Sequence, residues 1–127
     1  MGIDLFLQDN PNLAPRDQVR LERLAATTYP DRRRVRVEVD VTPFRERPNL
    51  EIALLSSEGL AVASATVLAT MHFKMEFTLH LRGVDDPAGE YTLRVQLYYD
   101  DAHMPQDVRE ITLHVPPAAP EDESETA

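Results

Sequence analysis

Residues 34–41 read Arg-Val-Arg-Val-Glu-Val-Asp-Val, and this stretch decides the fold. Valine occupies every second position, and a charged residue stands at each position between. Because successive side chains of a β-strand point to opposite faces, the pattern puts the valines on one face and the charges on the other. It predicts a half-buried strand, with one face in a core and the other in water.

The same alternation recurs on both sides of this strand. The predicted inward rows are Leu50, Ile52 and Leu54; Met71, Phe73, Met75, Phe77, Leu79 and Leu81; Tyr91, Leu93, Val95, Leu97 and Tyr99; and Ile111, Leu113 and Val115. Seven strands are expected, at residues 18–28, 33–43, 49–56, 60–70, 71–82, 90–100 and 108–115. A parallel sheet needs crossover helices, and no segment has a convincing helical period. The pattern therefore predicts an all-β fold of two antiparallel sheets.

Residues 60–70 are alanine-rich enough to suggest a helix as well as a strand. Their β-branched residues and the turn at residues 56–59 favour a strand. Its small side chains, Ala61, Ala63, Ala65, Val67 and Ala69, leave two alternatives open. If the row is exposed, a second subunit packs there or extends the sheet edge. If it is buried, it marks a place where two sheets approach closely.

Composition and charge set limits on the compartment and the partners. The 127 residues include no cysteine, which excludes a disulfide framework, a thiolate metal site and a cysteine nucleophile. The net charge of -9 argues against a partner that is a nucleic acid. Neither a secretory signal nor a membrane span is recognisable, so we expect a cytoplasmic protein with no membrane partner.

The chain is expected to have three parts. Residues 1–17 contain prolines at 11 and 15 and are predicted to form an extended N-terminal arm. Residues 18–115 form the sandwich domain. Residues 116–127 combine prolines with a cluster of acids and are predicted to be a disordered tail, because that composition buries too little apolar surface to order itself.

Residues 89–93, Gly-Glu-Tyr-Thr-Leu, resemble the tyrosine corner of immunoglobulin-like and fibronectin-III-like domains. The resemblance covers residues 18–115 and implies a seven-stranded immunoglobulin-like β-sandwich with Greek-key connections. It also implies that Tyr91, after Gly89, hydrogen-bonds back to the corner backbone. Pro87 and Leu93 depart from the antibody pattern, as does the absence of tryptophan. The likeness is therefore to the broad bacterial superfamily, which does not define a function.

The sequence contains residue types that suit two kinds of metal site. Thioether and imidazole ligands suit copper, and the chain offers Met71, His72, Met75, His80, His103, Met104 and His114. On a strand, however, Met71 and His72 point to opposite faces, and His72 and His80 lie about 26 Å apart. For calcium, Asp85 and Asp86 lie about 30 Å from Asp100 and Asp101. Asp100, Asp101 and Asp107 share one loop, where turn-forming aspartates are common.

No catalytic motif is recognisable. The sequence has no serine elbow and no Gly-rich phosphate loop among its four glycines. The run Arg32-Arg33-Arg34 with Arg36 alternates with acidic residues and is typical of a solvated strand face. We therefore expect no enzyme activity, no catalytic residue, no resident metal and no cofactor.

One end of the sandwich is the candidate binding site. The loops at residues 43–48, around 70–72 and at 100–107 are expected to meet there. The candidate residues are Arg45, Arg47, Asp100, Asp101, His103 and Asp107, with Met104 beside His103. The two arginines are expected to face the three aspartates, either as simple salt bridges or as a recognition surface.

These observations favour a non-enzymatic protein-interaction or assembly module, whose partner is another protein or a second copy of the chain. A carbohydrate- or other ligand-binding sandwich is the alternative, although Tyr98 is the only aromatic residue expected to point outward from a well-defined strand. A copper- or calcium-binding sandwich and a small hydrolase remain as further alternatives.

Overall fold

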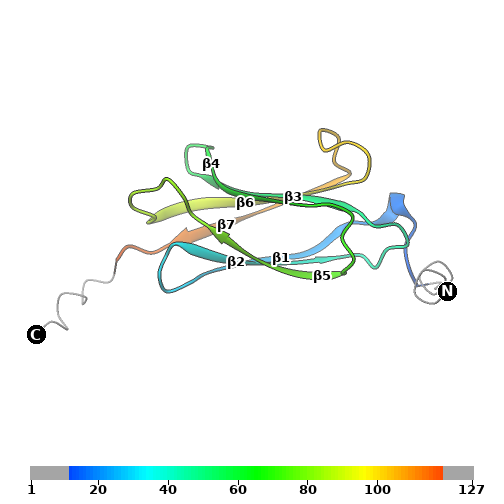
Figure 1. Ribbon diagram of the computed structural model, residues 1–127, viewed down its shortest axis with the longest axis horizontal. Coiled ribbons are helices and arrows are strands. Elements are labelled where there is room, and N and C mark those ends of the chain that lie inside the picture. Colours follow the sequence, from blue (N-terminus) through cyan, green and yellow to red (C-terminus); the bar gives the residue numbers. More distant parts are fainter. Residues whose placement is uncertain (1–11, 119–127) are drawn as a thin grey trace, which may run out of the picture.

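The computed structural model describes residues 12–118. A short 3-10 helix (η1, Arg16–Gln18) precedes seven strands that lie in two layers (Figure 1). The strands are β1 (Leu21–Thr28), β2 (Arg34–Val41), β3 (Asn49–Ser56), β4 (Ala61–Val67), β5 (Lys74–His80), β6 (Gly89–Tyr98) and β7 (Asp107–Val115). Most of the predicted arm and most of the predicted tail, residues 1–11 and 119–127, lie outside the described residues.

All strand pairs are antiparallel, in a three-stranded sheet of order β1-β2-β5 and a four-stranded sheet of order β4-β3-β6-β7. The second strand pairs with the fifth, the third with the sixth, and the sixth with the seventh, which is the strand order of the immunoglobulin-like sandwich. The predicted fold class is therefore confirmed. Residues 61–67 are a strand, as expected, and β4 forms one edge of the four-stranded sheet beside β3.

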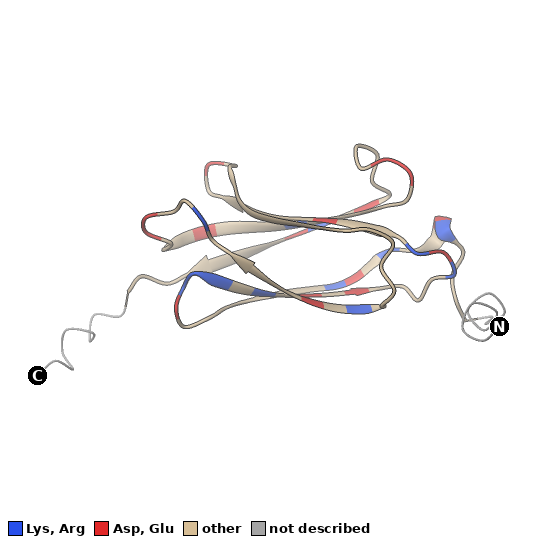
Figure 2. Cartoon of the chain, in the orientation of Figure 1, with Lys and Arg blue, Asp and Glu red and all other residues tan. Residues whose placement is uncertain are grey.

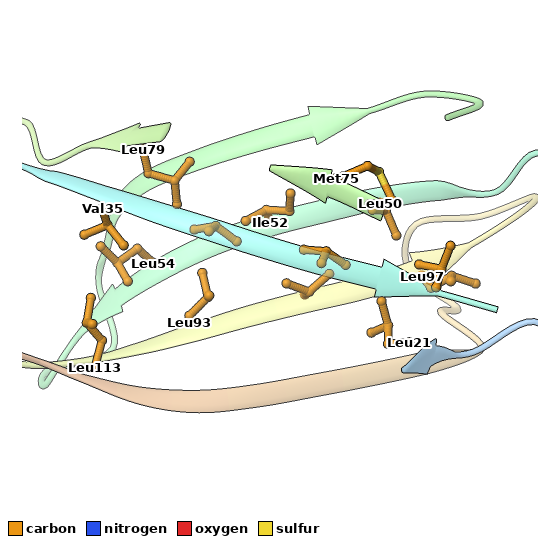
Figure 3. Close-up of a cluster of buried hydrophobic side chains, with 14 of the residues drawn as sticks. Leu21, Val35, Leu50, Ile52, Leu54, Met75, Leu79, Leu93, Leu97 and Leu113 are labelled. Carbon is orange, nitrogen blue, oxygen red and sulfur yellow. The ribbon is translucent and has the colours of Figure 1, made fainter. Parts of the chain in front are cut away.

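The core lies between the two sheets and consists of the predicted rows (Figure 3). Val35, Val37 and Val39 of β2 are fully buried, and Figure 3 shows the Val35 side chain close to Leu54 of β3. Each such side chain contributes about 1.5–3 kcal/mol when it leaves water. Because every second residue of β2 is a valine, one whole face of this strand is apolar and packs in the core.

The predicted inward row of β5 is wrong at its first member, because Met71 is 67% exposed. β4 ends at Val67, and Ala69 adopts a left-handed backbone with φ 51°, which breaks the alternation between the two strands. Thr70 takes the inward place instead and is 4% exposed. Its hydroxyl donates to the sulfur of Met75 at 3.1 Å.

Two further expectations fail at strand ends. Tyr98, expected to be an outward aromatic, is only 8% exposed. It ends β6 where the next loop folds back, and the N–H of Gln106 donates to the carbonyl of Leu97 there. The first strand begins at Leu21 rather than at residue 18, because Gln18 closes a turn of 3-10 helix onto the carbonyl of Pro15.

The short described part of the predicted N-terminal arm packs on the domain. Leu13 is 4% exposed, and Ala14 forms a parallel bridge with Phe44. The Phe44 ring in turn stands edge-on to the ring of Phe73, with 4.7 Å between centroids. Within residues 12–118, no helix is long and apolar enough to cross a membrane.

Candidate functional site

The loops at residues 43–48 and 99–106 meet at one end of the sandwich, and Arg16 joins them. Its guanidinium donates to Asp100 at 2.8 Å, lies 3.6 Å from Glu46, and stacks 4.5 Å from the centroid of the Tyr99 ring. The Tyr99 hydroxyl donates to the Glu46 carbonyl at 2.8 Å. Burial raises the pKa of Tyr99 to about 12.

The two arginines of the candidate site, Arg45 and Arg47, do not pair with the aspartates that they were expected to face. Arg45 donates from Nε to the carbonyl of Leu13 at 3.1 Å, so it holds the start of the domain rather than Asp100. Arg47 is exposed to solvent. The cation that pairs with Asp100 is Arg16, which sequence reasoning placed in a trailing arm and did not single out.

The aspartates of the candidate site stabilise backbone. Asp101 accepts the N–H of His103 at 2.9 Å, and this hydrogen bond is the main reason that the pKa of Asp101 is lowered. Asp107 accepts the N–H of Leu21 at 2.7 Å. His103 projects from the loop with a side chain that is 95% exposed. In the described part of the chain, no three His, Asp or Glu side chains are grouped so that they could hold a metal ion.

The basic run at residues 32–36 is also bound within the domain, at the opposite end and along β2. Arg33 donates to the carbonyls of Val84 and Asp85. Arg34 pairs with Asp31 at 2.7 Å, and the pKa of Asp31 is lowered first by the backbone N–H of Arg33 and then by Arg34. These arginines therefore fasten turns.

Basic and acidic positions both occur along the strands of the three-stranded sheet (Figure 2), and on its outer face their side chains form a lattice of ion pairs. Glu38 lies 2.6 Å from Arg23 and 2.9 Å from Arg36, and Arg36 reaches Glu76 at 3.1 Å. The side-chain hydrogen bond from Arg23 is the main cause of the lowered pKa of Glu38. Exposed pairs of this kind add little to stability, because water and salt screen the attraction between the charges.

Tyr91 makes the hydrogen bond that the tyrosine-corner resemblance implies. Its buried hydroxyl donates to the carbonyl of Pro87 at 2.8 Å. Gly89, two residues earlier, has φ 136°, a conformation that side chains rarely adopt. Burial raises the pKa of the Tyr91 hydroxyl. The role of the pair is structural, because it fixes the entry into β6.

The two long sides of the sandwich differ. On one side, β1 is fastened to β7: besides the bond from Leu21 to Asp107, the Arg109 guanidinium donates to the carbonyl of Glu22 at 3.0 Å. Gln106 donates to the carbonyls of Arg16 and Val19, both at 2.8 Å. This side is closed by hydrogen bonds between the sheets.

The opposite side, between β4 and β5, is open. A cleft of about 430 Å³ lies between the first half of β4 and the end of β5. A second cleft, of about 320 Å³, lies between Val67 and the start of β5. Across this side, one long backbone hydrogen bond is present among the described residues, from Arg82 to the carbonyl of Val62 at 3.4 Å. We call the outer backbone edge of β4 along this side the open edge.

Hydrogen bonding shows which backbone groups lie on the open edge. Ser56 donates to the carbonyl of Leu60, so Ser56 turns its backbone toward β4, as do alternate residues of β3 such as Ile52. The paired β4 residues at positions 63, 65 and 67 therefore point back to β3. Ser64 and Thr66, which lie between them, turn their N–H and C=O groups outward. Among the described residues, these outward N–H and C=O groups form no hydrogen bond with another backbone group.

The alanine row is neither fully exposed nor fully buried. Ala63, Ala65 and Val67 pack half-buried against the core, whereas Ala61 and Ala69 are exposed. Leu60 and Leu68, which flank the strand, are 63% and 69% exposed. The sequence signal for this site was the absence of any charge or proline from residues 60–70.

Comparisons with known proteins bear on the fold. No protein-family model and no curated protein matches the chain. Among solved structures, a β-glucuronidase of Bifidobacterium dentium is similar over 78% of this chain, with a TM-score of 0.61 and 18% identity. A glycosyl hydrolase family 2 member of Bacteroides cellulosilyticus covers 76%, with a TM-score of 0.54 and 15% identity. A putative β-galactosidase of Bacteroides fragilis covers 78%, with a TM-score of 0.52 and 16% identity.

At such identities the likeness concerns the fold alone. The chain spans 18%, 15% and 16% of the length of these three proteins, so their activities do not transfer to it. The comparisons show that this chain is a β-sandwich of a shape that also occurs as a small part of large glycosidase chains.

Proposed function

We propose that the chain is a non-enzymatic protein-interaction or assembly module of the immunoglobulin-like and fibronectin-III-like superfamily, and that it binds its partner by strand addition at the open edge. The observation that carries this proposal is the pair of outward-facing residues of β4, Ser64 and Thr66, whose outward backbone groups have no backbone partner among the described residues.

Edge strands of monomeric proteins are commonly protected by charged side chains, prolines or a covering segment. β4 has the sequence Ala-Val-Ala-Ser-Ala-Thr-Val, which contains neither charge nor proline. An extended segment of another chain that pairs with such an edge gains main-chain hydrogen bonds, and its alternate side chains enter neighbouring pockets. The two clefts beside β4 are suitably placed to receive them.

The arrangement of acids and bases supports a non-enzymatic role. Asp101 and Asp107 accept backbone N–H groups, and Arg16 is held by Asp100. A general acid or base must be free to exchange a proton with a substrate. These side chains instead stabilise loops of the domain.

The experiment compares affinity capture from source cells by three tagged proteins: the wild type, Ser64→Pro and Thr112→Pro. Proline at position 64 removes one outward N–H from the open edge. Proline at position 112 makes the matched change on β7, the other edge of the same sheet. We expect proteins that bind the wild type and Thr112→Pro but not Ser64→Pro. The same proteins on all three baits would contradict the proposal.

A carbohydrate-binding role is the second candidate, because the similar solved structures are named as glycosidases. Sugar-binding sandwiches are expected to display an exposed aromatic platform, and Tyr98, the aromatic residue expected to serve, is 8% exposed. Titration of the protein with glucuronide and galactoside oligosaccharides tests this role. Saturable heat of binding would favour it, and its absence would leave the protein-interaction proposal as the stronger one.

A further inference from the structure

We propose that the partner of the open edge is a second copy of this chain, whose β4 pairs antiparallel with the first β4 about a twofold axis at Ala65. This inference rests on the proposed function and names the partner of the same site. It predicts a continuous eight-stranded sheet in which the two β4 strands lie at the centre.

The free backbone groups select the register. In antiparallel pairing centred on Ala65, Ser64 of one copy lies opposite Thr66 of the other. Each of these two symmetric pairs exchanges two hydrogen bonds, so four bonds form and every outward group of Ser64 and Thr66 is used. The backbone hydrogen bond from Arg82 to Val62 can remain in the dimer, because position 62 lies outside the hydrogen-bonded pairs of Ser64 and Thr66.

The side chains fit the same register. The axis places Ala65 opposite Ala65 as a pair without mutual hydrogen bonds, in which the Cα atoms approach to about 4.5 Å and small side chains fit. Ala63 then lies opposite Val67. Farther out, the exposed Leu68 comes opposite the half-buried Val62. No like charges meet, because β4 carries no charge.

The other edges of the described residues suit self-pairing less well. β5 carries Lys74, Glu76 and the imidazole of His80 along its exposed face, and Lys74 and Glu76 already belong to the ion-pair lattice. β1 and β7 are fastened to each other by Asp107 and Arg109. Among the edge strands of the described residues, β4 is thus the one that carries no charge and is held across its outer side only by the long hydrogen bond from Arg82 to Val62.

A twofold axis closes the assembly at two copies, because each open edge is used up by the other. Pairing of a few residues buries less surface than a standard interface, so the dimer is expected to be reversible and to depend on concentration.

Cysteine cross-linking tests the register, since the natural chain contains no cysteine. Ala65→Cys places two thiols across the axis, within the 4.4–6.8 Å range of Cα distances that a disulfide allows. Ala63→Cys is the matched control: it lies on the same strand and face, but its two copies are about 13 Å apart in this register. Under mild oxidation we expect Ala65→Cys to form a disulfide dimer at least about tenfold faster. Equal rates for the two variants, or no dimer from either, would overturn the proposal.

Sedimentation of the intact chain then separates this inference from the proposed function. We expect a concentration-dependent dimer for the wild type and Thr112→Pro, and a folded monomer for Ser64→Pro. A Ser64→Pro protein that still dimerises overturns the inference, since the copies then meet elsewhere. A monomeric wild type that still captures proteins through the open edge overturns the inference alone. A monomer that captures nothing through that edge overturns both. If Ser64→Pro does not fold, the comparison of cross-linking rates between Ala65→Cys and Ala63→Cys still tests the inference.

Discussion

Arg16 illustrates what a single residue contributes to this domain. It joins the loops on either side of it through Asp100, Glu46 and the Tyr99 ring, and its partner Asp100 lies 84 positions away in the sequence. Alternation along the chain predicts which face a residue takes, but it carries no information on partners so distant. The sequence therefore predicted that the two loops meet, but it pointed to Arg45 and Arg47 as the cations that face Asp100, and the cation found there is Arg16.

Tyr91 offers a test of the corner hydrogen bond. Replacing Tyr91 by Phe leaves the buried carbonyl of Pro87 without its donor, which should lower the free energy of unfolding by about 1–3 kcal/mol. Tyr99→Phe removes a similar bond at a more exposed carbonyl and should cost about 0.5–1.5 kcal/mol. Urea unfolding measures both, and equal losses would argue against a special role for the corner.

Tyr99 also predicts a limit to alkaline stability. Its pKa is raised in the folded protein to about 12, above the ordinary value of 10, so the folded state favours the neutral hydroxyl. Its contribution to stability is complete below pH 10 and is lost as the pH rises from about 10 to about 12. Urea unfolding across this range should show a shallower decline in Tyr99→Phe than in the wild type. Parallel declines would contradict the assignment.

At the scale of the element, most of the strands could be predicted because apolar and polar residues alternate along them, whereas β4 was predicted from its β-branched residues and the turn before it. The errors fall where strands end. Met71 follows the left-handed Ala69, and Tyr98 stands where a loop turns back, so in both places local backbone geometry overrides the period of two. The open edge could be suspected from its composition, but its outward residues follow from the pairing of β3 with β4, which composition does not contain.

The central strand β3 gives the test of core packing. Ile52 is fully buried between the sheets, so Ile52→Ala should lower the free energy of unfolding by about 2–5 kcal/mol through lost burial and the cavity left behind. Leu60→Ala, at a side chain that is 63% exposed, should change it by less than about 0.5 kcal/mol. Chemical denaturation compares the two, and a similar cost at both positions would mean that the core is misplaced.

At the scale of the whole molecule, a chain with a net charge of -9 nevertheless joins Arg23 and Arg36 to acidic side chains on the outer face of one sheet. The structure thus pairs many of its acids internally and exposes an uncharged strand at the side of the other sheet. Charge patterning in the sequence predicted the solvated face of β2, whereas the contrast between a closed and an open side arises only when the two sheets are packed.

Three acidic side chains that accept hydrogen bonds predict acid sensitivity. The pKa values of Asp31, Glu38 and Asp101 are lowered in the folded protein, chiefly by hydrogen bonds from Arg33, Arg23 and His103, respectively. Their stabilisation is therefore present above the unfolded values of 3.8 and 4.5, and it is lost as the pH falls below them. The melting temperature should fall in that range, and it should fall less in Arg23→Gln. An unchanged slope in that variant would exclude the pair of Arg23 with Glu38 as a cause.

The fastening of β1 to β7 has a consequence for biosynthesis. The N–H of Leu21 donates to the carboxylate of Asp107, which lies 86 positions later in the chain. The carbonyl of Glu22 accepts from the guanidinium of Arg109, which lies 87 positions later. A ribosome makes the first strand long before the last, so a nascent chain that stops short of Asp107 cannot close its long side. Folding dominated by such distant contacts is slow, in the range of milliseconds to seconds. The domain is therefore expected to mature only after nearly all of it has left the ribosome, and until then its first strand remains a target for chaperones.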